Sequence, residues 1–449
     1  MIKKRTISLA VASALLVSGV EASTAGATSA GSGSTECGTS TGGGCAPDSA
    51  RVDLEQPSFS NPTEVTNPLF PIGRLESVVL LGHVEGKPFR TETTLLPGTT
   101  TVVLQGQPIE VLVSQYVAYL DGRIEEVALD RYAQDDNGAV WYFGEDVFDY
   151  RDGAIAITEG TWLAGREGPP AMIMPAHPKV GDAYRTENAP PIVFEEVTVD
   201  QLDRTVDGPT GRVNGALVAK ELHSDGTTEN KTFAPGYGEF RTAGGGDLEA
   251  LALAIPADAL PGPPPAELQA LLTAAGAILE SARLRDWESA SAALARSTAT
   301  WRTMRADQPP MIVARLDEAL ARLTRALKSH ASARAAQAAI DVQQSALDVT
   351  LRYRPAAEVD ARRFELWTQQ LRVLAAAKDL AGVTGTIAAL EWIRDRFANT
   401  LDPVSREEVD GRLRALRAAT DARNLPAAAD HAARLGARVR DLRTVASDS

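Results

Sequence analysis

Alternation of apolar and polar residues is the main pattern of residues 57–256. The runs from Glu110 to Val117 and from Asn214 to Leu222 alternate with period two, which is typical of half-buried strands. Dipeptides that tolerate positive φ separate runs of this kind: Asp121-Gly122, Asn137-Gly138, Asp152-Gly153 and Asp225-Gly226. Turns spaced by about eight to twelve residues predict an antiparallel meander of roughly nine to eleven strands. Because twist accumulates across so many strands, the meander should curl into a barrel, a half-barrel or a sandwich.

The pattern changes to helical spacing over residues 266–449. One apolar stripe illustrates it: Leu268, Leu271, Ala275, Ile278 and Ala282. A short break around Asp286 recurs near Ser332, Asp379 and Asn424, at intervals of about 46 residues. Prolines stand between these units, where a helix can begin without its first N–H groups: Pro309, Pro310, Pro355 and Pro403. We therefore predict an α+β protein in which about four helical hairpins, arranged as a bundle or as an array, follow the meander.

The N-terminus has the pattern of an export signal. Three basic residues, Lys3 to Arg5, precede an apolar run from Ile7 to Val20, and small residues follow at Ala25-Gly26-Ala27. We predict a cleaved signal peptide over residues 1–27 and an exported protein, periplasmic or extracellular. No later run is long and apolar enough for a transmembrane segment, so none is expected after cleavage.

Two stretches should connect the predicted domains. Residues 28–56 are rich in Gly, Ser and Thr, which predicts a flexible tether. Cys37 and Cys45 lie within this stretch, and the sequence leaves open whether they pair. Residues 257–265 are rich in proline and predict a semi-rigid linker between the β domain, residues 57–256, and the helical domain.

Charge restricts the partners. The formal net charge is -14, which argues against nucleic acid or an anionic membrane as the main partner. Residues 1–250 carry 18 basic and 35 acidic side chains, whereas residues 251–449 carry 27 basic and 24 acidic ones. This asymmetry fits docking of an acidic domain against a basic one or against a cationic partner. The simpler interpretation is a solvated acidic surface that favours solubility.

Motifs for several common chemistries are missing from the sequence. It contains no phosphate-binding Gly-x-x-x-x-Gly-Lys-Ser/Thr loop, no dinucleotide-binding Gly-x-Gly-x-x-Gly and no zinc-binding His-Glu-x-x-His. The five histidines do not occur in pairs at helical ligand spacing. No catalytic residue and no cofactor are therefore assigned, although calcium and copper deserve consideration at two places.

The first place is an acidic segment after the aromatic run 141–143. Glu145, Asp146, Asp149 and Glu159 supply hard oxygen ligands of the kind that Ca²⁺ takes in sets of six to eight. The alternative is a pair of hairpins with acidic turns and a half-buried aromatic strand.

The second place is the segment that holds Met172, Met174 and His177. Two thioethers and an imidazole suit a soft cation such as Cu(I). Alternation also puts both methionines on one face of an extended segment, which is typical of core residues.

Three motifs carry a resemblance to a known family. In order along the chain they are Trp141-Tyr142-Phe143-Gly144-Glu145-Asp146, the segment 158–165 and the segment 174–184. Over residues 57–256 the chain resembles a family of uncharacterised exported bacterial proteins, many of them lipid-anchored. The resemblance implies export and transfers no catalytic residue. This chain lacks a cysteine at the end of its signal, so lipid attachment is not expected.

Taken together, these patterns predict an exported, non-catalytic binding or assembly protein. Its concave β domain would take a ligand or peptide, and its helical hairpins would contact a protein partner. The first alternative is an extracytoplasmic metal-handling protein that uses one of the two candidate sites. The second is an enzyme whose acid and base are carboxyl groups.

Overall fold

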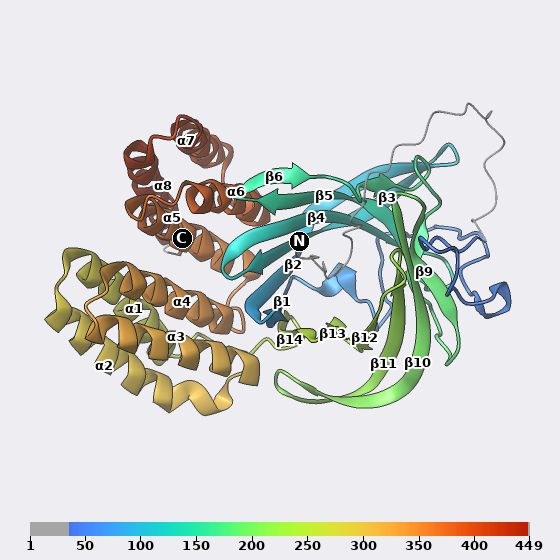
Figure 1. Cartoon of the computed structure of the whole chain (residues 1–449), viewed down its shortest axis with the longest axis horizontal. Coiled ribbons are helices and arrows are strands. Elements are labelled where there is room, and N and C mark those ends of the chain that lie inside the picture. The colour runs from blue at the N-terminus through green and yellow to red at the C-terminus, as the bar shows by residue number, and fades with distance from the viewer. Residues whose placement is uncertain (1–35, 448–449) are drawn as a thin grey trace.

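The computed structural model describes residues 36–447, so the predicted signal peptide over residues 1–27 lies outside the described residues. The described chain folds into an antiparallel sheet followed by helices, which confirms the α+β prediction (Figure 1). The strands are β1 (Ser77–Val84), β2 (Lys87–Leu104), β3 (Gln107–Leu120), β4 (Arg123–Gln134), β5 (Val140–Arg151), β6 (Ala154–Ile157), β7 (Trp162–Leu163), β8 (Ala171–Met174), β9 (Ala183–Ala189), β10 (Val193–Gly208), β11 (Gly211–His223), β12 (Thr228–Ala234), β13 (Gly238–Gly244) and β14 (Asp247–Ile255).

Most strands pair with their neighbours along the chain as a meander, and in addition the first strand, β1, pairs with the last strand, β14. Its order is β6-β5-β4-β3-β2-β1-β14-β13-β12-β11-β10-β9, and β7 and β8 also pair with β5. All fourteen described strands belong to one sheet, which favours the predicted barrel or half-barrel over the sandwich. The sheet curls until β8, paired with β5, lies beside β9 without a backbone ladder to it (Figure 1). The strands therefore surround an interior with one unpaired seam.

The strand count exceeds the prediction because of three short strands. Eleven strands have seven or more residues, as the turn spacing predicts, whereas β6, β7 and β8 have two to four. Strands this short do not show alternation. The predicted turns are present, with positive φ at Asp121, Gly138, Asp152 and Gly226.

The helices form four hairpins, which confirms the repeat read from the sequence. They are α1 (Ala266–Leu284), α2 (Trp287–Met304), α3 (Pro310–Lys328), α4 (Ser332–Thr350), α5 (Ala356–Ala376), α6 (Leu380–Phe397), α7 (Pro403–Asp421) and α8 (Leu425–Ser447), with 3₁₀ helices at Asp48–Ala50, Ile72–Arg74, Arg305–Asp307 and Ala398–Thr400. The turn inside each hairpin has one residue at positive φ: Arg285, His330, Lys378 and Arg423. Such a residue ends a helix and reverses the chain. None of the described helices combines the length and the apolarity needed to cross a membrane.

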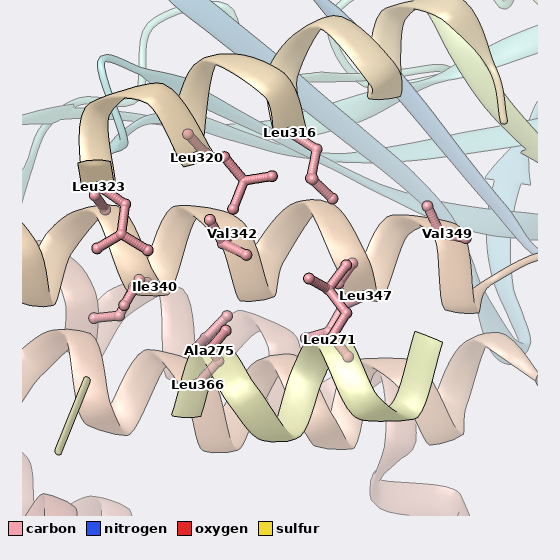
Figure 2. Packing of buried hydrophobic residues seen from close by; sticks show 14 of the residues in the cluster. Leu271, Ala275, Leu316, Leu320, Leu323, Ile340, Val342, Leu347, Val349 and Leu366 are labelled. Atoms are coloured by element: carbon pink, nitrogen blue, oxygen red, sulfur yellow. The ribbon is translucent and has the colours of Figure 1, made fainter. Parts of the chain in front are cut away.

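The hairpins pack as two pairs. Helices α1 to α4 share one apolar core, in which α3 and α1 contribute leucines on either side of α4 (Figure 2). Helices α5 to α8 share a second core. The second pair lies beside the hairpin of β4 and β5, and the first pair lies nearer to β1 and β14 (Figure 1).

The helices cover the outer face of the sheet. Val79 and Leu253, from β1 and β14, belong to the same core as α1 to α4. Farther along the sheet, the ring of Tyr119 stacks on Trp367 of α5 at 5.2 Å between centroids. The opposite, inner face of the sheet therefore remains free of helices.

Buried ion pairs join the two halves. Glu92 of β2 accepts hydrogen bonds from Arg90 at 2.7 Å and from Arg396 of α6 at 2.5 Å. Asp348 of α4 accepts from Arg90 at 2.7 Å and from Arg363 of α5 at 2.8 Å. Burial alone would raise the pKa of the Glu92 carboxyl, but the three guanidinium groups hold it well below its usual range. The acidic half and the basic half therefore meet through charge pairing.

Both predicted connecting stretches are tied to the folded domains. In the proline-rich linker, the Leu260 N–H donates to the Arg352 carbonyl oxygen at 2.6 Å, and Asp258 is buried. Residues 36–56 are not a free tether: Cys37 and Cys45 form a disulfide, and the Ala46 N–H donates to Glu196 at 2.6 Å. Their short side chains let the backbone lie directly on the sheet, which composition alone did not indicate.

Gly153, in the turn between β5 and β6, allows close contact with α6. A Cβ at this position would lie 2.2 Å from the Ala381 carbonyl oxygen and 2.4 Å from the Gly385 nitrogen. We expect Gly153→Ala to lower the free energy of unfolding by about 3 kcal/mol, from strain at positive φ plus the clash with the helix backbone. The matched control is Gly226→Ala, which has the same backbone strain and open space around its Cβ. It should cost only about 1 kcal/mol in denaturant titrations. Equal losses would contradict the close contact.

Candidate functional site in the sheet interior

The structure does not gather the four predicted hard ligands. Glu145 is fully buried in the sheet, whereas its neighbour Asp146 lies on the other face and pairs with Arg131. Asp149 is half-buried, and Glu159 is exposed in the loop after β6. Burial raises the pKa of Asp149 to about 6, and the negative charges of Glu125 and Glu159 add to this rise. Of the four, Glu145 alone joins the carboxyl groups described below.

The predicted soft site is also divided. Met172 and Met174 are buried in the apolar core, opposite Trp141 and Val140 of β5. The His177 imidazole is exposed beyond the end of β8. Both methionines therefore act as core residues and do not share a site with the histidine.

A different set of carboxyl groups lies inside the curled sheet. They come from neighbouring strands on both sides of the interior: Asp130, Glu145, Glu187, Glu195, Glu221, Glu229, Glu239 and Glu249. Six of them line an internal cavity of about 110 Å³, namely Asp130, Glu187, Glu195, Glu221, Glu239 and Glu249. Lys231 is the one basic side chain that lines the described cavity. We call this set the interior carboxyl cluster.

Strand register places several of these groups directly opposite one another. Glu187 of β9 pairs with Glu195 of β10, and Glu221 of β11 pairs with Glu229 of β12. On the far side, Asp130 of β4 pairs with Glu145 of β5. Like charges directly opposite on adjacent strands are destabilising. These pairs therefore require a proton or a cation between them.

Two basic side chains reach the cluster. The His223 Nδ1 atom lies 3.0 Å from Glu195 Oε1, and its Nε2 atom lies 3.7 Å from Glu229 Oε1 and 3.9 Å from Glu221 Oε2. The Lys231 Nζ atom lies 2.9 Å from Glu221 Oε2. Burial alone would lower the pKa of His223, but the surrounding glutamates raise it to about 9.

Other members of the cluster have oxygen atoms without a donor. Both oxygens of Glu145, Oε1 of Glu187 and Oε2 of Glu249 are buried without a hydrogen-bond donor in the described structure. Burial raises the pKa of Glu249 to about 8, with a further contribution from Glu239. Burial also raises the pKa values of Glu145 and Glu187 far above the usual range, and these two carboxyl groups are close enough to share a proton. The interior therefore holds protons or takes up a cation at neutral pH.

A groove lies between the sheet and the helical half. Its volume is about 1220 Å³, and it runs between the tips of the hairpins β1–β2, β3–β4 and β5–β6 and helices α3, α4, α5 and α6. Tyr116 lines both this groove and the internal cavity, and its hydroxyl group has no partner. Tyr116 is therefore the residue that the linings of the groove and of the cavity share.

No protein-family model matches the chain, and no curated protein matches it.

Proposed function

We propose that this protein is an exported binding protein that takes up a small cation in the interior of its curled sheet. The observation that carries the proposal is the composition of the cavity wall, in which six carboxyl groups accompany one lysine. Export enters the proposal from the signal pattern in the sequence and from the resemblance to exported proteins.

Buried carboxyl oxygens without a donor favour the binding of a cation. An ionised carboxylate taken out of water costs several kcal/mol unless a cation or hydrogen-bond donors compensate. Glu187 and Glu249 face the cavity and each has an oxygen atom without a donor. A cation in the cavity would compensate both groups at once.

The size of the cavity favours a small ligand. A volume of about 110 Å³ accommodates a few water molecules at about 30 Å³ each. A metal ion with part of its hydration shell fits this space, whereas drug-sized ligands need at least about 300 Å³. The cavity therefore supports cation uptake better than peptide binding, and the metal-handling alternative becomes the preferred form of the binding hypothesis.

Thermal unfolding in the presence of different cations tests the proposal. The untagged protein, freed of metal, would be unfolded at pH 7.5 with K⁺, Mg²⁺, Ca²⁺, Mn²⁺, Zn²⁺ or methylammonium. A cation at about 100 times its dissociation constant should stabilise the native state by about 2.7 kcal/mol, which raises the melting temperature by several degrees.

A pair of double variants supplies the control. Glu187→Gln with Glu249→Gln removes two interior charges and should remove most of the shift. Glu55→Gln with Glu64→Gln removes two exposed charges and should leave the shift unchanged. The proposal is refuted if none of the cations stabilises the native protein, or if both double variants respond alike.

A further inference from the structure

This inference rests on the proposed function and specifies its ligand. We propose that the cation is a divalent transition-metal ion held by Glu195, Glu221 and His223. One ligand atom from each of the three residues lies within 4.8 Å of the others. In the described residues this group of histidine and carboxylate side chains could hold a metal ion.

The strands already place the three ligands. Glu195 of β10 lies directly opposite His223 of β11, and Glu221 is two residues before His223 on the same face of that strand. Zn²⁺ with nitrogen and oxygen ligands at about 2.0 to 2.2 Å requires ligand atoms roughly 3 to 3.5 Å apart. The ligand atoms lie within 4.8 Å of one another, so binding requires the side chains on the adjacent strands β10 and β11 to rotate toward a common point.

The donor set selects the class of metal. One imidazole and two carboxylates suit Zn²⁺, Mn²⁺, Fe²⁺ or Co²⁺. Ca²⁺ takes six to eight oxygen ligands, so a site with an imidazole and two carboxylates suits it less well. Cu(I) prefers thiolates and thioethers, which this group lacks.

A separate observation indicates an exchangeable ligand at this site. Glu187 is the cross-strand neighbour of Glu195, is 3% exposed, lines the cavity that Glu195 and Glu221 also line, and has a buried Oε1 without a hydrogen-bond donor. This oxygen can complete the coordination sphere or accept a hydrogen bond from a metal-bound water. The adjacent cavity of about 110 Å³ provides room for that water.

Lys231 acts as a built-in competitor of the metal. Its ammonium group lies 2.9 Å from Glu221 Oε2, so it pairs with an oxygen of a proposed metal ligand. In the empty site this ion pair neutralises Glu221. A metal ion that binds Glu221 competes with the ammonium group for this carboxylate, so Lys231 should weaken the affinity.

Metal titration of the full-length, untagged protein tests this arrangement. We expect one equivalent of Zn²⁺, Mn²⁺ or Co²⁺ per chain by calorimetry. His223→Gln should weaken the affinity about 100-fold, because a ligand is lost. Lys231→Met should tighten it at least about tenfold, because the competing charge is removed. The matched control is His177→Gln, which removes an exposed imidazole and should leave the affinity unchanged.

A spectroscopic measurement distinguishes the loss of a metal ligand from the loss of the fold. Bound Co²⁺ reports its ligands through its visible absorption, and Glu221→Gln should shift or abolish the bands of a protein whose circular dichroism is native. The inference is overturned if His223→Gln and His177→Gln bind the metal equally well, or if Lys231→Met weakens binding. Stabilisation by Ca²⁺ or methylammonium that depends on Glu187 and Glu249, with no transition metal bound, would overturn this inference and leave the proposed function intact. Absence of binding by every cation would refute both.

Discussion

Replacing Arg396 by methionine is expected to lower the free energy of unfolding by about 3 to 5 kcal/mol. The Arg396 guanidinium is fully buried between the halves, donates to Glu92 at 2.5 Å and to the Gln115 side chain at 2.6 Å, and lies 3.8 Å from Asp360. Its removal leaves buried carboxylates without enough positive charge, which is the costly way to break a buried ion pair. Denaturant titration followed by circular dichroism measures the loss.

A second arginine on the same helix provides the control. Arg394 stands two residues away, is 24% exposed and pairs with Asp410 within the helical half. Arg394→Met should cost less than about 1 kcal/mol, as exposed ion pairs do. Adding Glu92→Met to Arg396→Met should restore part of the stability, because both members of the pair are then apolar. Similar losses for Arg394→Met and Arg396→Met would show that the buried network does not hold the halves together.

The metal-free protein is expected to lose stability as the pH rises from about 5 to 8. The pKa of Glu249 is about 8 in the native state because the carboxyl group is buried near Glu239 and Glu229, with Lys231 opposing their effect. In the unfolded chain the same group titrates near 4.3. Between these values the native state holds a proton that the unfolded state has released, so stability falls by about 1.4 kcal/mol per pH unit for such a group.

Other titratable groups either lower the stability as the pH rises through this range, as Glu249 does, or leave it unchanged. The pKa of Asp130 is about 6 because it is buried, so it adds to the loss at the acidic end of the range. The pKa of His223 is raised to about 9, so its contribution is complete below about 6.5 and is lost as the pH rises through 9. The pKa of Glu92 is lowered, and its contribution is constant above about pH 5.

Single Glu→Gln substitutions isolate the contribution of Glu249 to the pH dependence of stability. Glu249→Gln should reduce the slope of unfolding free energy against pH by about 1.4 kcal/mol per unit between pH 5 and 8. Glu64→Gln, an exposed substitution, should leave the slope unchanged. Stability that rises with pH in this range, or an unchanged slope in Glu249→Gln, would be incompatible with a protonated interior.

The sequence predicted the helical half closely because its signals are local. Each hairpin turn depends on a short segment, and the breaks near Asp286, Asp379 and Asn424 are followed at once by helices that begin at the next residue. Proline at the first position of α3 and α7 marks the other joints. Contacts between distant strands play little part in these features, so periodicity and capping residues were enough.

The interior carboxyl cluster depends instead on a register that the sequence leaves uncertain by one residue. The turn at Asp225-Gly226 is predicted, but a two-residue turn there would place Glu221 opposite Asn230. In the structure the loop is longer by one residue, so Glu221 lies opposite Glu229. A slip of one residue turns every following side chain to the other face of the sheet. The opposed carboxyl pairs were therefore invisible without the pairing of the strands.

The acidic character of the first half now has a more specific interpretation. A solvated acidic surface was the simpler explanation of its composition. The structure places eight carboxyl groups in the interior, and Glu92 in the interface with the basic helical half. Alternation reveals strands but does not tell which polar face is turned inward, so composition could not distinguish these locations.

The segment formed by residues 36–53 covers part of an outer edge of the sheet. Strand β9 is the last in the sheet order, and the Val52 N–H donates to its Ala183 carbonyl oxygen while Asp53 accepts from the Arg185 N–H. Open strand edges are templates for pairing with a second chain. A protease that removed this segment would uncover part of that edge together with the Phe194 ring on which Gly38 rests. The trimmed molecule would then be expected to pair with a second chain along the edge that residues 51–53 cover in the intact protein.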